Sequence, residues 1–218
     1  MSLPTPNIAH LTEDDYEHIY EPAEDSFILL DALEIDAERI RRSKPAICVE
    51  VGAGSGIASA FLSNLLGRDQ SLIISTDINP YACKATLRTA TANDMTLNPV
   101  RCNLVTGLSD RLRIKIDLMI FNPPYVPTDL QELNETQSER DIGGAWAGGS
   151  DGMEVTNILL RQLPNLLSPG GTLYLVAVAQ NKPAQIIHEM KQLGLQAEEI
   201  IRRRAGREHL SVIRITRP

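Results

Sequence analysis

The sequence predicts an α/β fold in which a seven-stranded, mostly parallel sheet is doubly wound, with helices on both faces. Five short apolar runs alternate with longer helix-like segments from residue 46 onward, and parallel strands covered on both faces are apolar throughout. Two further strand-like segments, residues 196–202 and 209–216, follow one another across a polar turn around Gly206. They predict a C-terminal antiparallel hairpin at one edge of the sheet.

An amphipathic helix is expected ahead of the sheet, over residues 24–42, because apolar side chains such as Phe27 and Leu30 recur there at helical spacing. Asp25 or Ser26 lies near its start, where residues that cap helices are common. The apolar strands are expected at residues 46–51, 71–76, 100–103, 116–121 and 172–179. Further helices are expected at residues 56–66, 81–93, 153–167 and 183–193.

The chain of 218 residues is expected to form one domain over residues 20–218, preceded by an N-terminal tail over residues 1–19. A hydrophobic content of 43% is sufficient for a sizeable core. The longest interruption, residues 126–150, exceeds the roughly 12–15 residues above which connections are uncommon. It is interpreted as a substrate loop, with an inert insertion as the alternative.

Composition narrows the class of protein. No apolar run approaches the roughly 20 residues of a membrane span, and the first ten residues do not look like a signal peptide, which predicts an intracellular protein. A net charge of −7 disfavours binding of nucleic acid mainly through the protein's own surface. Cys48, Cys83 and Cys102 have no paired spacing and are interpreted as reduced thiols, and the four histidines predict no metal site.

The most informative stretch is Asn122-Pro123-Pro124-Tyr125, which follows the apolar run at residues 116–121. Two prolines end regular structure and hold an extended turn. The end of the strand therefore presents an amide, a rigid peptide carbonyl and an aromatic ring. This combination suits recognition of a planar NH2 group that is about to receive a methyl group; a plain strand terminator is the alternative.

A glycine-rich loop follows the first expected strand, with Gly52, Gly54 and Gly56 behind Glu50. Glycines allow a tight bend and a close approach of a ligand. The spacing Gly-x-Gly-x-Gly differs from the dinucleotide fingerprint Gly-x-Gly-x-x-Gly, and an acidic residue before the loop is unfavourable beside a pyrophosphate. Glu50 instead favours a cationic ligand, such as the sulfonium and ammonium groups of S-adenosylmethionine.

Other strand ends and the first helix extend this site. Asp77 ends the second expected strand, where a carboxylate can accept both hydroxyls of a ribose; capping of the next helix is the alternative. Asn103 and Leu104 follow the third strand, where an adenine edge would lie, although Asn is also a common turn residue. Tyr20 and Ser26 at the first helix would cover the methionine end of the cofactor, or would only start that helix.

Together these motifs resemble the class I (Rossmann-like) S-adenosylmethionine-dependent methyltransferases that modify planar nitrogens. Residues 20–26 and 145–155, which include Trp146, are similar to the HemK/PrmC-type glutamine methyltransferases. They are more similar still to the eukaryotic branch, which acts on the class I translation termination (release) factor. The resemblance runs from about residue 20 to the C-terminus.

The resemblance implies methylation of the glutamine in the Gly-Gly-Gln motif of the release factor, presented alone or with its GTPase partner. It also implies a heterodimer with a small zinc-binding activator subunit, in the cytoplasm and also in the nucleus. Asn122, Pro123 and Tyr125 would be catalytic; these three, with Pro124 and Trp146, would bind substrate, and Asn122 would also contact the cofactor. Two departures are Asn103, where the family commonly has an acid, and Ser26, where threonine is common.

Other functions remain open at this point. The resemblance also leaves lysine methylation of histones and adenine methylation of DNA or RNA as alternatives, although the acidic surface makes DNA the weaker candidate. The basic run at residues 202–204 is interpreted as a solvated turn. A non-catalytic module that only binds S-adenosylmethionine is disfavoured, because Glu50, Asp77 and Asn122 are all present. The activator surface is expected along the edge near residues 100–103.

Overall fold

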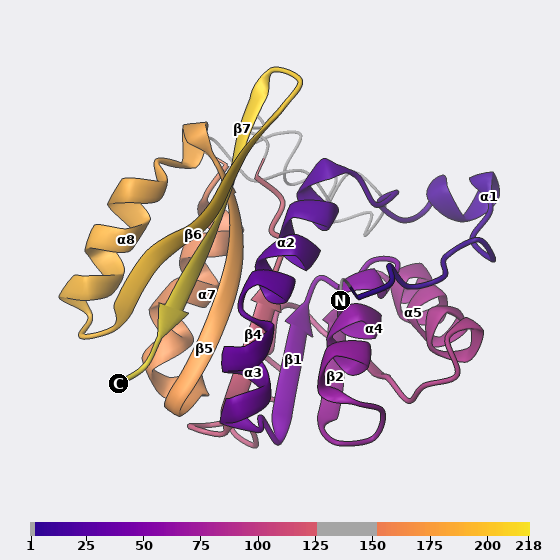
Figure 1. Ribbon diagram of the computed structural model, residues 1–218, viewed down its shortest axis with the longest axis horizontal. Helices are drawn as coiled ribbons and strands as arrows, with labels where there is room; N and C mark the ends of the chain where they lie inside the picture. Colours follow the sequence, from indigo (N-terminus) through magenta and orange to yellow (C-terminus); the bar gives the residue numbers. More distant parts are fainter. Residues whose placement is uncertain (1–2, 126–151) are drawn as a thin grey trace.

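The computed structural model describes residues 3–125 and 152–218. Within these residues, seven strands form one sheet in the order β3-β2-β1-β4-β5-β7-β6 (Figure 1). The parallel strands are β1 (Ile47–Val51), β2 (Leu72–Asp77), β3 (Asn98–Arg101), β4 (Ile116–Phe121) and β5 (Leu167–Val178). Strand β7 (Glu208–Thr216) lies antiparallel between β5 and β6 (Gln196–Ala205). The predicted fold class and C-terminal hairpin are confirmed.

Helices cover both faces of the sheet (Figure 1). One face carries α2 (Glu24–Ile35), α3 (Ala37–Ser43), α4 (Ile57–Leu66) and α5 (Pro80–Ala92), and the other carries α7 (Glu154–Leu166) and α8 (Pro183–Gln192). Two separate apolar clusters result, one around Phe61 of α4 and one around Leu159 of α7. None of the described helices is both long and apolar enough to cross a bilayer.

The expected helix over residues 24–42 is divided in two at Asp36, so this prediction is wrong in one respect. Asp36 leaves helical geometry (φ −92°, ψ 11°), and its carboxylate accepts the Tyr174 hydroxyl at 2.7 Å and pairs with Arg214. These two partners lie on β5 and β7. The break therefore comes from tertiary contacts that the local helical pattern does not contain.

Two strand boundaries also differ from the expected ranges. Strand β3 spans Asn98–Arg101 instead of residues 100–103, because Asn98 already pairs with Ile74 of β2. Strand β5 begins at Leu167 instead of residue 172, because Leu167 pairs with Ile116 before a shift of register. In both cases pairing with the neighbouring strand starts earlier than the apolar run.

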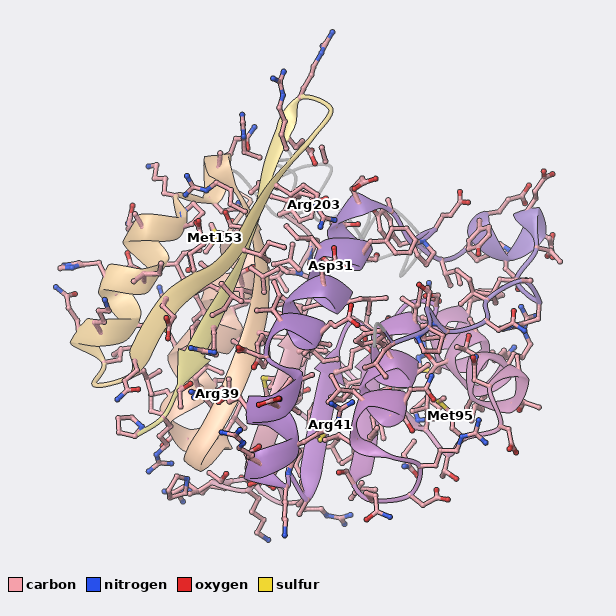
Figure 2. All side chains as sticks on the ribbon, viewed as in Figure 1. Asp31, Arg39, Arg41, Met95, Met153 and Arg203 are labelled. Atoms are coloured by element: carbon pink, nitrogen blue, oxygen red, sulfur yellow. The ribbon has the colours of Figure 1, made fainter. Side chains whose placement is uncertain are left out.

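Side-chain contacts fasten the N-terminal helices to the rest of the fold (Figure 2). Arg203 of β6 and Asp31 of α2 point toward one another and form an ion pair. The Arg41 Nε of α3 donates to the carbonyl oxygen of Leu65 at 2.9 Å. The first contact fixes α2 across the sheet and the second fixes α3 on α4. The first turn of α2 lies at the carboxyl ends of the strands.

The segment before residue 20 also packs on the domain. It contains a short helix, α1 (Glu13–Tyr16), and its Leu11 and Ile19 are buried against α5. Asp15 pairs with Arg88 of α5 at 2.6 Å. The division of the chain at residue 20 stays a prediction, but the described part of the tail is held by apolar and ionic contacts.

Candidate active site

A pocket of about 450 Å³ opens at the carboxyl ends of the central strands. It lies between the loop after β1, the ends of β2 and β4, and the first turn of α2. The sheet order changes direction here, from β1-β2-β3 on one side to β4-β5 on the other. Ligands of open α/β sheets bind at such a switch point, and this volume is typical of small-molecule sites.

The glycine-rich loop forms one wall of the pocket. Gly52 and Gly54 line it, and both have positive φ, 67° and 52°. A Cβ on Gly54 would meet no atom within 4 Å, so the backbone there faces open space. Gly56 lies outside the lining; a Cβ there would come within 2.9 Å of Thr86 Cα, so this glycine lets α4 pack closely on α5.

Asp77 lies at the end of β2 and also lines the pocket. Its Oδ2 accepts the backbone N–H of Gly54 at 2.9 Å and its Oδ1 accepts that of Asn79 at 2.8 Å. Asn79 itself caps α5, because its side chain accepts the N–H of Tyr81, so the alternative role of Asp77 as that cap is wrong. Burial raises the pKa of Asp77 above its ordinary value.

Glu50 lines the floor of the pocket and is 6% exposed. Its Oε2 accepts the backbone N–H of Ser59 at 2.9 Å, in the first turn of α4. It thereby replaces the cap that Gly56, which has no side chain, cannot supply. Burial raises the pKa of Glu50 to about 8. A cation in the pocket would favour the ionised form of this carboxyl group.

Asp25 joins the first turn of α2 to the turn after β4. The sequence alone indicates it only as a residue near the start of a helix. Its Oδ2 accepts from Asn122 Nδ2 at 2.9 Å and from the Tyr125 hydroxyl at 3.2 Å. Its Oδ1 accepts from the Tyr20 hydroxyl at 3.1 Å and from the Ser26 N–H at 2.7 Å. Asp25 is 4% exposed, and all five side chains line the pocket.

The same contacts leave one acceptor of Asn122 available. Its Oδ1 is buried and has no hydrogen-bond partner among the residues that the structure describes. Burial, together with the nearby Asp25 carboxylate, raises the pKa of Tyr20 and of Tyr125. Both hydroxyls therefore remain protonated donors near neutral pH. The end of β4 presents a carbonyl oxygen that is ready to accept a hydrogen bond.

The remaining predicted site residues divide into three groups. Pro123 and Pro124 line the pocket beside Asn122. Asn103 and Leu104 line it beyond the end of β3, with Leu104 at a positive φ of 49°. Trp146 and the predicted substrate loop at residues 126–150 lie outside the described residues.

Further residues that line the pocket were not predicted, and they include Val155 and Ile158 of α7 and Glu208 at the start of β7. Ile158 is 51% exposed although it is a large apolar side chain. Val155 ends the stretch 145–155 that carries the family resemblance, whereas no motif marks Ile158 or Glu208. Only the folding of the sheet brings α7 and the hairpin to the pocket. In the sequence, Ile158 stands out only as a large apolar residue that lies outside the buried stripe of α7.

Comparison with known proteins places these features in a family. No family model matches the chain. It is 46% identical over 216 residues to "Methyltransferase HEMK2" of Mus musculus, covering 99% of this chain and 98% of that protein. It is 41% identical over 224 residues to "eRF1 methyltransferase catalytic subunit mtq2" of Schizosaccharomyces pombe, covering 99% and 96%.

Solved structures agree. One similar structure is the E. cuniculi Mtq2-Trm112 complex, which is described as responsible for methylation of the eRF1 translation termination factor. The matching chain has a TM-score of 0.66 and 25% identity, and the match covers 92% of this chain and 99% of that one. A T. thermophilus 16S rRNA methyltransferase in complex with AdoMet and guanosine has a TM-score of 0.60 at 16% identity, which shows the fold alone. The predicted resemblance is confirmed: the chain belongs to the HEMK2/Mtq2 family of methyltransferases.

Proposed function

We propose that this chain is the catalytic subunit of a heterodimer that methylates the glutamine side chain in the Gly-Gly-Gln motif of the class I release factor. The observation that carries the proposal is the buried, unpartnered Oδ1 of Asn122 at the edge of a pocket in a methyltransferase fold. Such an atom lacks a donor, and the N–H of a planar amide supplies one. The names of the fission yeast and E. cuniculi relatives support the choice of release factor as substrate.

The residues of the pocket fit S-adenosylmethionine. This cofactor supplies a methyl group activated by a sulfonium centre. The open side of Gly54 admits a ligand against the backbone, and the Asp77 carboxylate suits the hydroxyls of a ribose. Glu50 is a buried carboxyl group that a cationic ligand would stabilise in its ionised form. Asn103 and Leu104 would border the adenine, and Tyr20 and Ser26 the methionine end.

Orientation of the substrate is the main contribution of the chain to the reaction. An amide nitrogen is a poor nucleophile because its lone pair is delocalised into the carbonyl group. Asn122 Oδ1 and the Pro123 carbonyl oxygen would accept its two N–H bonds, which turns the nitrogen toward the methyl group and favours positive charge developing there. The Tyr125 ring would pack on the amide plane and exclude water. Orientation of this kind can lower a barrier by about 7–11 kcal/mol.

The second subunit is proposed to be a small zinc-binding activator, which docks on the edge of the sheet at β3. In the described residues β3 pairs with β2 alone, so one side of its backbone remains available for a strand from a partner. Ile78 and Tyr81, which follow β2, are exposed apolar residues. The heterodimer would work in the cytoplasm, where release factors act, and also in the nucleus.

Transfer of a labelled methyl group tests the proposal. The chain, alone and with the activator, is incubated with release factor, with a release factor whose Gly-Gly-Gln glutamine is replaced by asparagine, with histone and with DNA. Label is expected on the unaltered release factor alone, and only when the activator is present. Label on DNA or histone but not on release factor would overturn the choice of substrate. Cofactor binding by calorimetry without any transfer would indicate a non-catalytic module.

A further inference from the structure

The buried carboxylate of Asp25 is bonded to the side-chain amide of Asn122, the group proposed to bind the substrate. We infer that Asp25 is the positioning residue that sets the orientation of the Asn122 amide, so that Oδ1 and not Nδ2 faces the methyl-accepting group. The inference rests on the proposed function only for the identity of that group. The two residues are 97 positions apart in the chain and belong to α2 and to the turn after β4.

The chemistry of the two groups dictates the orientation. The two ends of an Asn amide have nearly the same shape, but rotation by half a turn exchanges a donor for an acceptor. A carboxylate has no hydrogen to donate, so it selects the Nδ2 end, which donates to Asp25 Oδ2 at 2.9 Å. Oδ1 then points to the other side, where it is buried and has no partner among the described residues. A neutral neighbour able to both donate and accept would not make this selection.

Asp25 is itself held in place from three directions. The Ser26 N–H and the Tyr20 hydroxyl donate to Oδ1, and the Tyr125 hydroxyl donates to Oδ2 beside Asn122. Asp25 also lies in the first turn of a twelve-residue helix, where the helix dipole favours a negative charge. These donors leave the carboxylate little freedom to turn, so the geometry is prepared before any substrate arrives.

This arrangement gives the N-terminal helix a role in the reaction. Tyr20 and Ser26 donate hydrogen bonds to Oδ1 and hold the Asp25 carboxylate in place. Its other oxygen, Oδ2, then orients the Asn122 amide by accepting from Nδ2. The Arg203–Asp31 pair anchors the next turn of the same helix to β6 (Figure 2). The turn at Asn122 is therefore oriented for its substrate only when α2 is docked on the sheet.

Nuclear magnetic resonance on the full chain, with its activator subunit, tests the orientation without any need for substrate. Asparagine side-chain amides are labelled with nitrogen-15, and the Asn122 signal is assigned by its loss in Asn122→Ser. One of its two Nδ2 hydrogens is expected to be shifted downfield and slow to exchange, because it is bonded to a charged acceptor. Rapidly exchanging, unshifted hydrogens in the unaltered protein would overturn the inference.

Kinetics of Asp25→Asn test the consequence, since this variant keeps the size of the side chain and removes the charge. The downfield signal is expected to disappear and kcat on release factor to fall by about 100-fold, the effect of a misplaced reacting group, while KM changes little. Glu24→Gln in the same turn of α2 is the matched control and is expected to change neither, because Glu24 is exposed and does not line the pocket.

The other possible results of these two experiments also decide between explanations. An Asp25→Asn variant with normal turnover contradicts the inference, and one that loses cofactor binding in calorimetry makes Asp25 a cofactor ligand instead. If Asp25→Asn does not fold, the Asn122 signal of the unaltered protein still decides the orientation. If the unaltered protein does not methylate release factor, the proposed function fails while the resonance experiment remains valid.

Discussion

The carboxylate of Asp77 accepts the backbone N–H of Gly54 at 2.9 Å, and this bond fastens the loop after β1 to the end of β2. Its second oxygen holds the N–H of Asn79, which caps α5. One side chain thus shapes the glycine-rich wall of the pocket, and under the proposed function its oxygens would also accept the hydroxyls of a ribose. Loss of Asp77 would therefore affect the binding site twice.

Asp77→Ala is expected to weaken binding of S-adenosylmethionine by about 10- to 100-fold, since hydrogen bonds to a charged group contribute about 1.5–3 kcal/mol. Titration calorimetry measures the change. Asp110→Ala is the control, because Asp110 is exposed and does not line the pocket. Equal affinities of the two variants would argue against a ribose role for Asp77.

Gly54→Ala and Gly206→Ala separate backbone strain from ligand contact. Both glycines have positive φ, 52° and 58°, and a Cβ on either would meet no atom within 4 Å. Each variant should lose about 1–2 kcal/mol of unfolding free energy, the cost of a left-handed conformation for alanine. Of these two glycines, Gly54 lines the pocket and Gly206 does not, so Gly54→Ala alone should weaken cofactor binding. Urea unfolding and calorimetry on both variants check this, and similar affinities would place the ligand away from the loop.

Much of this site follows from the sequence because its parts lie at strand ends. The turn at Asn122, the glycine loop and Asp77 each follow an apolar run, and parallel strands bring their carboxyl ends to one edge. The local sequence pattern and the strand topology are therefore enough to predict that these residues share one site.

Other parts depend on contacts that no local pattern contains. Asp25 looks like an ordinary helix start, because its partners Asn122 and Tyr125 lie about a hundred residues away. The break at Asp36 has the same origin, since Tyr174 and Arg214 lie still farther along the chain. Only the docking of α2 on the sheet gives these carboxylates their roles.

Asp36→Ala is expected to destabilise the fold strongly. Arg214 and Asp36 have side chains only 13% and 12% exposed. Removal of Asp36 leaves Arg214 with only the more exposed Glu198 as a partner and takes the acceptor from the Tyr174 hydroxyl. Such losses cost about 3–5 kcal/mol. Glu38→Ala is the control, because its pair with Arg42 is more than 80% exposed on both sides and contributes less than about 1 kcal/mol. Urea unfolding measures both, and a loss in Asp36→Ala as small as that of the control would contradict the role of the buried pair.

Glu50 should make stability depend on pH when no cofactor is bound. Burial raises its pKa in the folded state from 4.5 to about 8, so the folded protein holds a proton that the unfolded chain has released between these values. The stabilisation is therefore complete below about pH 4.5 and declines as pH rises to about 8, by at most about 1.4 kcal/mol per pH unit.

Glu50→Gln isolates this effect, because glutamine keeps an oxygen for the Ser59 N–H and cannot ionise. The unfolding free energy of the variant, measured in urea from pH 5 to pH 9, should fall less steeply than that of the unaltered protein. Parallel curves would show that Glu50 is already ionised in the folded state.

Asn122→Ala should strongly reduce methyl transfer while leaving the fold and cofactor affinity largely intact. Asn122 follows β4 and its Oδ1 makes no hydrogen bond within the described residues, so little of the fold depends on that atom. Loss of one preorganised group at a reacting centre costs about 100- to 1,000-fold in kcat. Asn165→Ala, at an exposed position on α7, is the control for general effects of the substitution. Single-turnover transfer to release factor and calorimetry together give the answer: a variant that binds cofactor normally and still methylates at the normal rate would remove Asn122 from the reaction.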